Sequence, residues 1–219
     1  QETIAYSSVE ARWERELAGN ADPIRVLNPI AAPLAVMRSS LFGSLVATLR
    51  HNLAHRAPRV RIFEAGRVYQ RNASATYGEV SVAGIDQPMR VAALACGPVD
   101  ALQWGAPERL IDFFDIKGDV QALVAPRELV FESASHPALH PGRSARLSLH
   151  GQAVGWIGEL HPRWRQAYEL PHVPVMFEID LNALIERDFP QLQPLPRQQA
   201  VQRDLALVVA DAVSHDALI

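Results

Sequence analysis

The chain has 219 residues, of which 48% are hydrophobic and 21% charged, enough apolar material for a packed core, and this excludes a disordered chain. The formal net charge of −3 excludes a general basic field for holding nucleic acid, and the single cysteine, Cys96, excludes an intrachain disulfide or a cysteine-based metal cluster. No apolar run approaches the roughly 18 residues that cross a bilayer, so we expect a cytoplasmic protein without a membrane contact. The first residue is Gln1 rather than methionine, from which we expect a piece of a longer protein.

The first 37 residues predict short elements joined by loops. Residues 2–9 favour a short strand and residues 9–17 a short helix, which Gly19 can end. A second short strand is expected at residues 24–28. Two prolines then keep the chain extended up to the next helix.

Residues 38–72 contain the best-marked helix and strand of the chain. Leu41, Leu45 and Leu49 recur every four residues and predict an amphipathic helix over residues 40–54. Pro58 resists its continuation, and the β-branched and aromatic residues that follow predict a strand over residues 59–70.

The rest of the first 190 residues predicts an α+β domain with a mainly antiparallel sheet. A hairpin is expected from strands at 79–85 and 89–96, followed by a helix at 112–124 with aspartates near its positive end. A second hairpin is expected to turn at His150-Gly151. The remaining expected elements are strands at 128–132, 144–149, 153–159 and 175–181, a short helix near Pro162, and a brief helix that Pro190 ends.

The composition changes after residue 190. Residues 191–200 are rich in glutamine and proline, which is typical of a linker. Residues 201–209 predict a strand, and Ser214 can cap a helix that begins at His215. We therefore divide the chain into a domain at 1–190, a linker at 191–200 and the first fragment of another domain at 201–219.

Sequence-local chemistry is weak. His136 and His140 have the spacing of zinc ligands on a helix, but a proline follows each of them, so we expect a loop and no metal site. Cys96 lies in an apolar stretch and is expected in the core. A basic and aromatic patch at Arg67, Tyr69 and Arg71 is open to two interpretations, a phosphate or RNA contact and ordinary surface pairing.

Six phrases of the sequence, in order, resemble the β subunit of bacterial phenylalanyl-tRNA synthetase: NPIAAPLAVMRSSLFGSLVATLRHNL, RVRIFEAGRVYQRN, DFFDIKGDVQALV, HPGRSARL, VGWIGELHP and FEIDL. The resemblance implies a class II synthetase-like antiparallel sheet flanked by helices at 1–190, and the first strand and helix start of a ferredoxin-like anticodon-binding domain at 201–219. It also implies an α subunit, phenylalanine tRNA and an (αβ)₂ heterotetramer as partners, with ATP and magnesium used by the whole enzyme.

The same resemblance places RVYQRN at the second signature of class II synthetases, where catalytic members carry an arginine that binds the α-phosphate of ATP. Here Gln70 stands at the arginine position and Asn72 at the acidic partner position. Both charges are missing, so the resemblance implies a domain without catalytic residues or a cofactor of its own. The alternative is a shifted register that puts Arg71 at the phosphate position.

We therefore predict a catalytically silent scaffold that contacts the α subunit. The expected contacts are Arg38, Leu41, Leu45, Leu49 and Glu64, although the leucines could equally serve the core and the charged pair could be an internal salt bridge. An alternative function is an RNA-binding module, with Arg203 as a tRNA contact. A third, an active adenylating domain, rests on fold analogy alone.

Overall fold

The computed structural model of this chain describes residues 1–186, 192, 199, 201–213, 217 and 218. The chain divides into two units, Gln1–Arg187 and Asp188–Ile219, which we describe separately. No helix in the described ranges is both long and apolar enough to cross a membrane.

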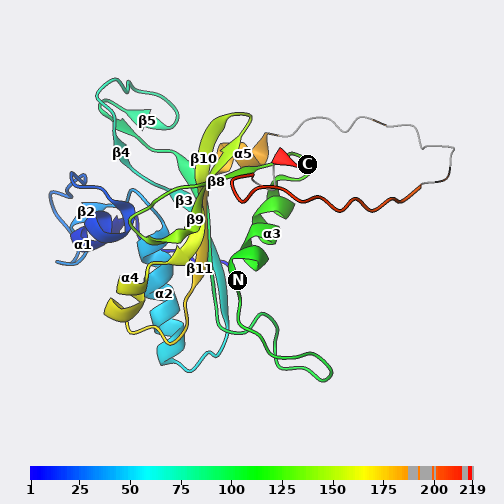
Figure 1. The fold of residues 1–219 in the computed structure, drawn as a ribbon. Helices are drawn as coiled ribbons and strands as arrows, with labels where there is room; N and C mark the ends of the chain where they lie inside the picture. The colour runs from blue at the N-terminus through cyan, green and yellow to red at the C-terminus, as the bar shows by residue number, and fades with distance from the viewer. Residues whose placement is uncertain (187–191, 193–198, 200, 214–216, 219) are drawn as a thin grey trace. The chain divides into compact units, whose positions relative to one another are not determined.

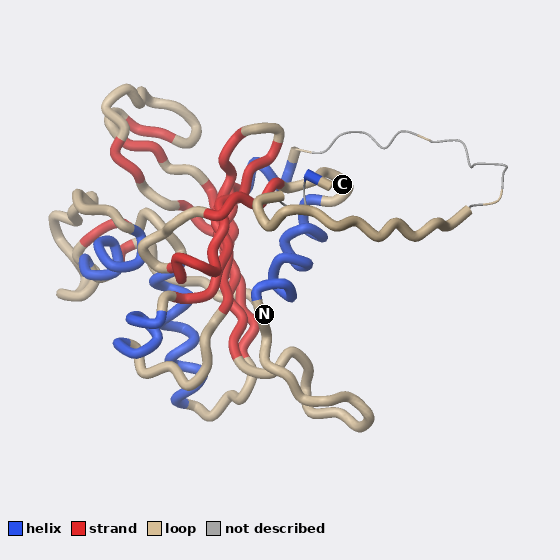
Figure 2. Tube along the Cα trace, viewed as in Figure 1, coloured by secondary structure: helices blue, strands red, loops and turns tan. Residues whose placement is uncertain are grey.

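A six-stranded antiparallel sheet forms the centre of the first unit (Figures 1 and 2). Its strands, in spatial order, are β3 (Val60–Arg67), β7 (Met89–Cys96), β11 (Val175–Asp180), β10 (Gln152–Leu160), β9 (Leu139–Leu149) and β8 (Val130–Ser133). The predicted antiparallel α+β fold is confirmed at this level. The β9–β10 turn lies at His150 and Gly151, as predicted, and both residues have positive φ.

Helices cover both faces of this sheet (Figure 1). On one face lie α2 (Phe42–Ala54), α1 (Ala11–Trp13), the π-helix η1 (Glu14–Ala18) and α4 (Pro162–Ala167); on the other lie α3 (Phe113–Val124) and α5 (Leu181–Ile185). Each face has its own buried apolar cluster, so the unit holds two core layers. The predicted helices at 40–54 and 112–124 are confirmed to within about two residues.

The expected hairpin between residues 79–85 and 89–96 is wrong. Strand β5 (Ser81–Val82) pairs with β6 (Ile85–Asp86), which pairs with β4 (Gln70–Arg71) in a separate three-stranded sheet. Strand β7 instead lies between β3 and β11, because its run of small and apolar side chains is suited to a strand covered on both faces.

The N-terminal elements are shorter than expected. Of the strand expected at residues 2–9, only Ser8–Val9 forms a strand, β1, which pairs with β2 (Val36–Met37). Residues 24–28 contribute a single bridge between Arg25 and Val36 in place of the second expected strand. The backbone near Glu2 instead bonds to Phe63 at the edge of β3. Gly19 ends the first helical segment with φ at +69°, as its position predicted.

In the second unit, the strand expected at residues 201–209 is wrong, since these residues form no strand. They have high β propensity, but a strand needs a pairing partner for its backbone, and Leu205 and Val208 are 85% and 103% exposed. The helix start expected at 215 and most of the linker at 191–200 lie outside the described residues.

Candidate functional site

A row of mostly polar residues crosses one face of the six-stranded sheet. Residues directly opposite each other on antiparallel strands share a face, so the register places them side by side. The row consists of Glu64, Ala92, Glu178, Trp156, Arg146 and Glu132. Two residues further along, Ile62, Leu94 and Met176 belong to the apolar cluster under α2. The row therefore marks the boundary between the part of the face that α2 covers and the part beyond its N-terminus.

Three consecutive residues just before the N-cap of α2, Leu41, each bind a different buried carboxylate. The pairs are Arg38 Nη1 to Glu64 Oε1 at 2.6 Å, Ser39 Oγ to Glu14 Oε2 at 2.5 Å, and Ser40 Oγ to Glu178 Oε2 at 2.8 Å. The three acceptors come from β3, η1 and β11. This junction fixes the start of α2 against two strands and the N-terminal helical segment.

The Arg38–Glu64 ion pair is the most buried charge pair of the junction, with side chains 3% and 2% exposed. Arg38 Nε also donates to the carbonyl of Arg67, and Glu64 Oε1 also accepts from the Ala5 amide. A Cβ at Gly66 would lie 2.2 Å from Arg38 Nη2, so glycine is required for this close approach. The pair is built into the interior of the unit.

A cavity of about 310 Å³ opens beside the row. Its lining is Arg90, Arg146, Ala153, Val154, Gly155, Trp156, Glu178 and Asp180. Arg90 Nε donates to Asp180 at 3.1 Å, and Arg90 Nη1 lies 3.7 Å from Glu178. The Arg146 guanidinium lies over the Trp156 ring, 5.2 Å from its centroid. Two arginines and two carboxylates thus give the lining a formal charge of zero.

Burial is the largest cause of the pKa shifts of Glu178 and His136. It raises the pKa of Glu178, while Arg90 and the hydrogen bonds from Ser40 and the Leu41 amide act in the opposite direction. Burial also lowers the pKa of His136 to about 4, with a further contribution from Arg90. With this lowered pKa the imidazole of His136 is neutral at neutral pH. It packs against Trp156 of the cavity lining, with ring centroids 5.0 Å apart.

Of the two residues expected at the degenerate signature, Gln70 lies in β4 of the small sheet and Asn72 directly follows that strand; neither is in the cavity lining. Gln70 is opposite Asp86 in the β4–β6 register. Asn72 Nδ2 donates to Asp86 Oδ2 at 2.6 Å, and Asn72 Oδ1 accepts from Ser74. Both residues therefore make local contacts without a charge of their own.

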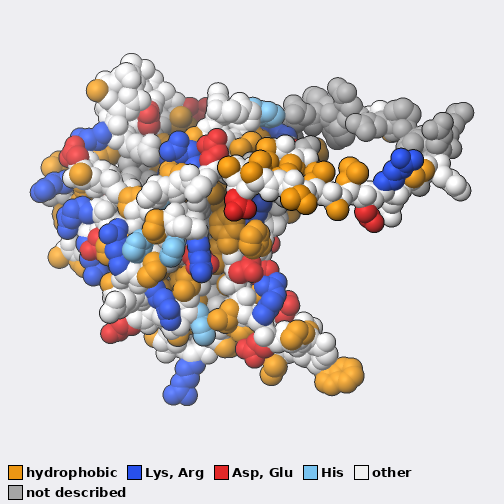
Figure 3. All heavy atoms as spheres, viewed as in Figure 1, with side chains coloured by type: hydrophobic (Ala, Val, Ile, Leu, Met, Phe, Trp, Pro, Cys, Tyr) orange, Lys and Arg blue, Asp and Glu red, His pale blue; other side chains and the backbone are white. Residues whose placement is uncertain are grey.

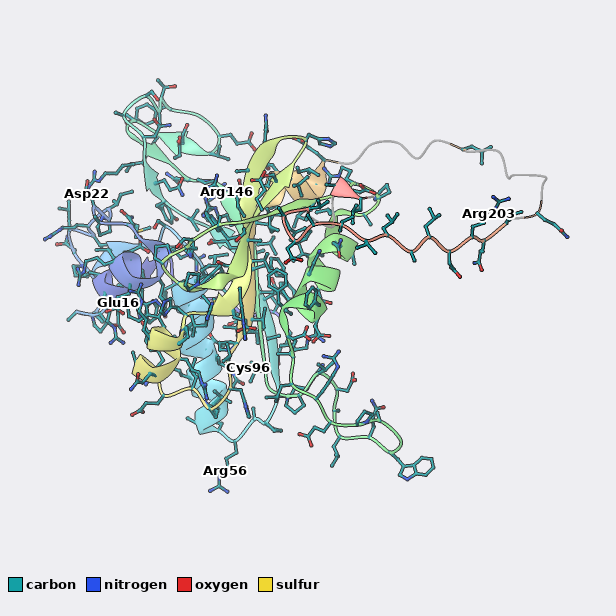
Figure 4. All side chains as sticks on the ribbon, in the orientation of Figure 1. Glu16, Asp22, Arg56, Cys96, Arg146 and Arg203 are labelled. Atoms are coloured by element: carbon teal, nitrogen blue, oxygen red, sulfur yellow. The ribbon has the colours of Figure 1, made fainter. Side chains whose placement is uncertain are left out.

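Arg71, the alternative candidate for the phosphate position, is 53% exposed and forms an ion pair with Asp22 at 2.9 Å. Its Nε also reaches the Asp22 carbonyl, and Figure 4 shows Asp22 in the N-terminal region. Arg67 donates to the carbonyl of Gln87. Of the two interpretations of this basic patch, the contacts of Arg67 and Arg71 agree with ordinary pairing within the chain.

The expected subunit contacts are buried inside the unit. Leu41, Leu45 and Leu49 are 0% exposed and belong to the apolar core, while Arg38 and Glu64 pair with each other. The sequence left open whether the leucines serve the core and whether the charged pair is internal. In the structure the leucines lie in the core and the charged pair is an internal salt bridge. Within this chain the five side chains are taken up by the core and by each other, and their contact with an α subunit stays a prediction.

Other candidate groups have structural roles. His136 Nδ1 and His140 Nδ1 accept from backbone amides two residues ahead, and the described residues contain no group of three or more metal-ligating side chains. Asp112 and Asp115 form a reciprocal capping box on α3, and Arg109 holds the pKa of Asp115 at about 2. Cys96 is 2% exposed, in the core as expected.

Sequence reasoning missed the acceptors Glu14 and Glu178 and the cavity residues Arg90, Arg146 and Trp156. The alternation FEID at 177–180 carried a usable signal, since it puts Glu178 and Asp180 on the same face of a strand. Nothing local indicated their partners, because Ser40 and Glu178 are 138 residues apart.

The fold and this site define an α+β protein with an antiparallel sheet and a charge-balanced cavity on one face of that sheet. A profile described as the phenylalanyl tRNA synthetase beta chain CLM domain matches residues 1–181, and the chain belongs to this family. The family resemblance expected from the six phrases is thereby confirmed for this domain.

Curated relatives extend the match over nearly the whole chain. The phenylalanine–tRNA ligase beta subunit of Burkholderia lata is 58% identical over 217 residues, or 99% of this chain and 27% of the relative. The proteins of the same name from Ralstonia nicotianae and Bordetella bronchiseptica are 52% and 53% identical over 218 and 211 residues, covering 100% and 95% of this chain and 27% and 26% of the relatives. The chain thus spans about a quarter of the length of these relatives.

Proposed function

We propose that this chain is a non-catalytic, synthetase-like part of a phenylalanine–tRNA ligase β subunit that serves as a scaffold for the α subunit. The observation that carries the proposal is the local pairing of Gln70 and Asn72 with the loop and strand around Asp86, since neither residue supplies a charge for a phosphate. The names of the relatives and the family match support the assignment to this ligase.

Adenylate formation places negative charge on the α-phosphate of ATP and needs cations that are free to receive it. In the cavity, Arg90 is already engaged by Asp180 and lies near Glu178, which leaves Arg146 as the single arginine of this lining without an acidic partner among the described residues. A carboxylate about 4 Å from a phosphate charge opposes it by about 4 kcal/mol at an effective dielectric constant of 20. Gln70 and Asn72 add no compensating charge, so the proposed site of ATP, magnesium and phenylalanine is the α subunit.

The whole enzyme is then a cytoplasmic class II (αβ)₂ assembly that attaches phenylalanine to its tRNA. Its α-facing surface must consist of exposed residues. Leu102 and Trp104, in the connection between β7 and α3, are 94% and 101% exposed and are suitable anchors for such a contact. Co-purification of the α subunit with a Leu102→Asp, Trp104→Asp double variant of the β subunit tests this surface.

Phenylalanine-dependent ATP–pyrophosphate exchange by the complete α–β complex tests the non-catalytic role. We expect Gln70→Ala and Asn72→Ala in the β subunit to leave the exchange rate within about twofold of the parent, and Arg71→Ala to do the same. Loss of a group that stabilises transition-state charge costs about a hundredfold or more. A loss of that size in a complex of unchanged mass would overturn the proposal.

We further propose that residues 201–219 begin an anticodon-binding domain of ferredoxin-like fold, continued outside this chain. Support comes from the relatives, whose match extends over nearly all of the chain but only about a quarter of their own length. Arg203 is exposed on the extended segment in Figure 4 and is a candidate phosphate contact. Figure 3 shows Arg and Lys dispersed among acidic and apolar side chains on the visible face, which gives no competing basic surface there.

Salt-dependent binding of phenylalanine tRNA by the complete β subunit tests this second role. If Arg203 contacts one phosphate, Arg203→Gln should reduce the slope of log affinity against log salt by about one. An unchanged slope would remove Arg203 from the RNA contact and leave the scaffold as the sole proposed role.

A further inference from the structure

Arg146 is the arginine of the cavity lining that forms no ion pair with the described acidic residues around it. Its guanidinium stacks over the face of Trp156, with 5.2 Å from the guanidinium carbon to the ring centroid. The N–H donors of a guanidinium point outward in its plane, and no acidic side chain of the described ranges pairs with those of Arg146. Figure 4 shows Arg146 and Cys96 toward different ends of the six-stranded sheet, so Arg146 lies on the part of the face that α2 leaves open.

Acidic side chains surround Arg146 without engaging it. Glu132 is opposite Arg146 in the β8–β9 register, but Arg146 forms no ion pair with any acidic residue of the described ranges. Asp180 is bound by Arg90 instead. Both oxygens of Glu178 accept hydrogen bonds from the α2 junction, at Ser40 Oγ and the Leu41 amide.

The floor of the cavity is strand backbone brought close by a small residue. Strand β10 has a register shift between Ala153 and Gly155, which leaves Val154 outside the pairing. A Cβ at Gly155 would lie 2.2 Å from the carbonyl oxygen of Glu178, so β10 and β11 can approach here because this residue is glycine. The result is a concave space of about 310 Å³ beside an available guanidinium edge.

We propose that this cavity binds the oxyanion group of a small molecule, a carboxylate or a phosphate, through a two-pronged hydrogen bond from Arg146. A planar guanidinium edge matches two oxygens of such a group, and charge assistance makes these bonds strong. Arg90 lines the same cavity and adds positive charge behind Arg146, where it is largely offset by Asp180 and Glu178. The inference stands apart from the scaffold role, because it concerns a ligand of this chain alone.

A second stacked arginine provides a matched control. Arg163 lies over Trp164, 4.3 Å from the ring centroid, so it has the same type of aromatic contact. Its Nη2 already donates to the carbonyl of Pro137, and it is not among the residues that line the cavity. Substituting Arg163 therefore removes an exposed stacked cation and leaves the proposed binding group in place.

The test is a titration of the 219-residue chain with inorganic phosphate and, separately, with acetate, at constant ionic strength, followed by NMR of the indole N–H groups. We expect a saturable shift at Trp156 that is absent at Trp164. Arg146→Gln should raise the dissociation constant about tenfold or more, and Arg146→Lys should also weaken binding because it keeps the charge without the planar fork. Whichever anion saturates at lower concentration identifies the preferred group.

Arg163→Gln should bind like the parent, and the spectrum of each variant shows directly whether it is folded. The proposal is overturned if folded Arg146→Gln titrates like the parent, if the indole signals of Trp156 and Trp164 shift together without saturation, or if Arg163→Gln weakens binding as much as Arg146→Gln does.

Discussion

Replacing Arg38 by methionine should cost about 3–5 kcal/mol of unfolding free energy, because it leaves Glu64 charged, buried and without its cation. The Glu64 side chain is 2% exposed, and after the substitution its remaining bonded donor is the Ala5 amide. The Arg67 carbonyl also loses its hydrogen bond from Arg38 Nε. These two losses act in the same direction and make Arg38→Met one of the most damaging single substitutions outside the apolar core.

The double variant Arg38→Met, Glu64→Leu is the matched comparison. Apolar replacement of both members of a buried ion pair is often neutral, so we expect the double variant to recover most of the loss. Urea denaturation at pH 7, followed by circular dichroism, measures the unfolding free energy of both variants. A single variant that loses less than about 1 kcal/mol, or a double variant no more stable than the single one, would refute this account of the junction.

Three further changes test the packing and the titration of the first unit. Gly43→Ala should destabilise it by about 1–3 kcal/mol in urea denaturation, because the added Cβ would lie 2.7 Å from the Trp13 ring. Gly118→Ala, on the exposed face of α3 with open space around it, should instead stabilise by about 0.5–1 kcal/mol; the same sign for both variants would contradict the helix packing. For His136, burial lowers the pKa from 6.5 to about 4, so its contribution is fully present above pH 6.5 and is lost as pH falls toward 4. Between pH 7 and pH 4.5 the parent should lose about 2 kcal/mol more stability than His136→Gln, and equal losses would place His136 in solvent.

Elements with a strong local pattern could be predicted from the sequence. Leucines every four residues predict α2, Asp112 indicates the start of α3, and Gly151 indicates the β9–β10 turn. In each case the determining interactions lie within one helix or one turn, so the sequence carries them in neighbouring residues.

Pairing between distant segments could not be predicted in the same way. The segment at 79–85 is expected from the sequence to pair with 89–96, but β7 pairs with β3 and β11, which no local pattern specifies. Residues 201–209 have the composition of a strand but lack a partner among the described residues. The identity of the buried acceptors was missed for the same reason, since Glu14 and Glu178 meet the α2 junction only through the tertiary fold.

The degenerate signature was the most informative part of the candidate site. Gln70 and Asn72 are expected as uncharged replacements; Gln70 lies in the small sheet opposite Asp86, and Asn72, just after that strand, bonds to Asp86 and Ser74. The cavity on the main sheet is lined instead by residues of four strands, β7, β9, β10 and β11, and its charge pairs join β7 to β11. The sequence thus predicted a domain without catalytic charges at Gln70 and Asn72, which stays a prediction, while the positions of the remaining charges required the fold.

Counting adenylate sites tests the central claim most directly. When the complete α–β complex is mixed with excess ATP and phenylalanine in the absence of tRNA, the amplitude of the first turnover reports how many sites form phenylalanyl-adenylate. A non-catalytic β subunit predicts no more than one adenylate per αβ pair, with none formed by the β subunit alone. An amplitude approaching two per pair, reduced to one by substituting Arg71 or Arg90 in the β subunit, would contradict it.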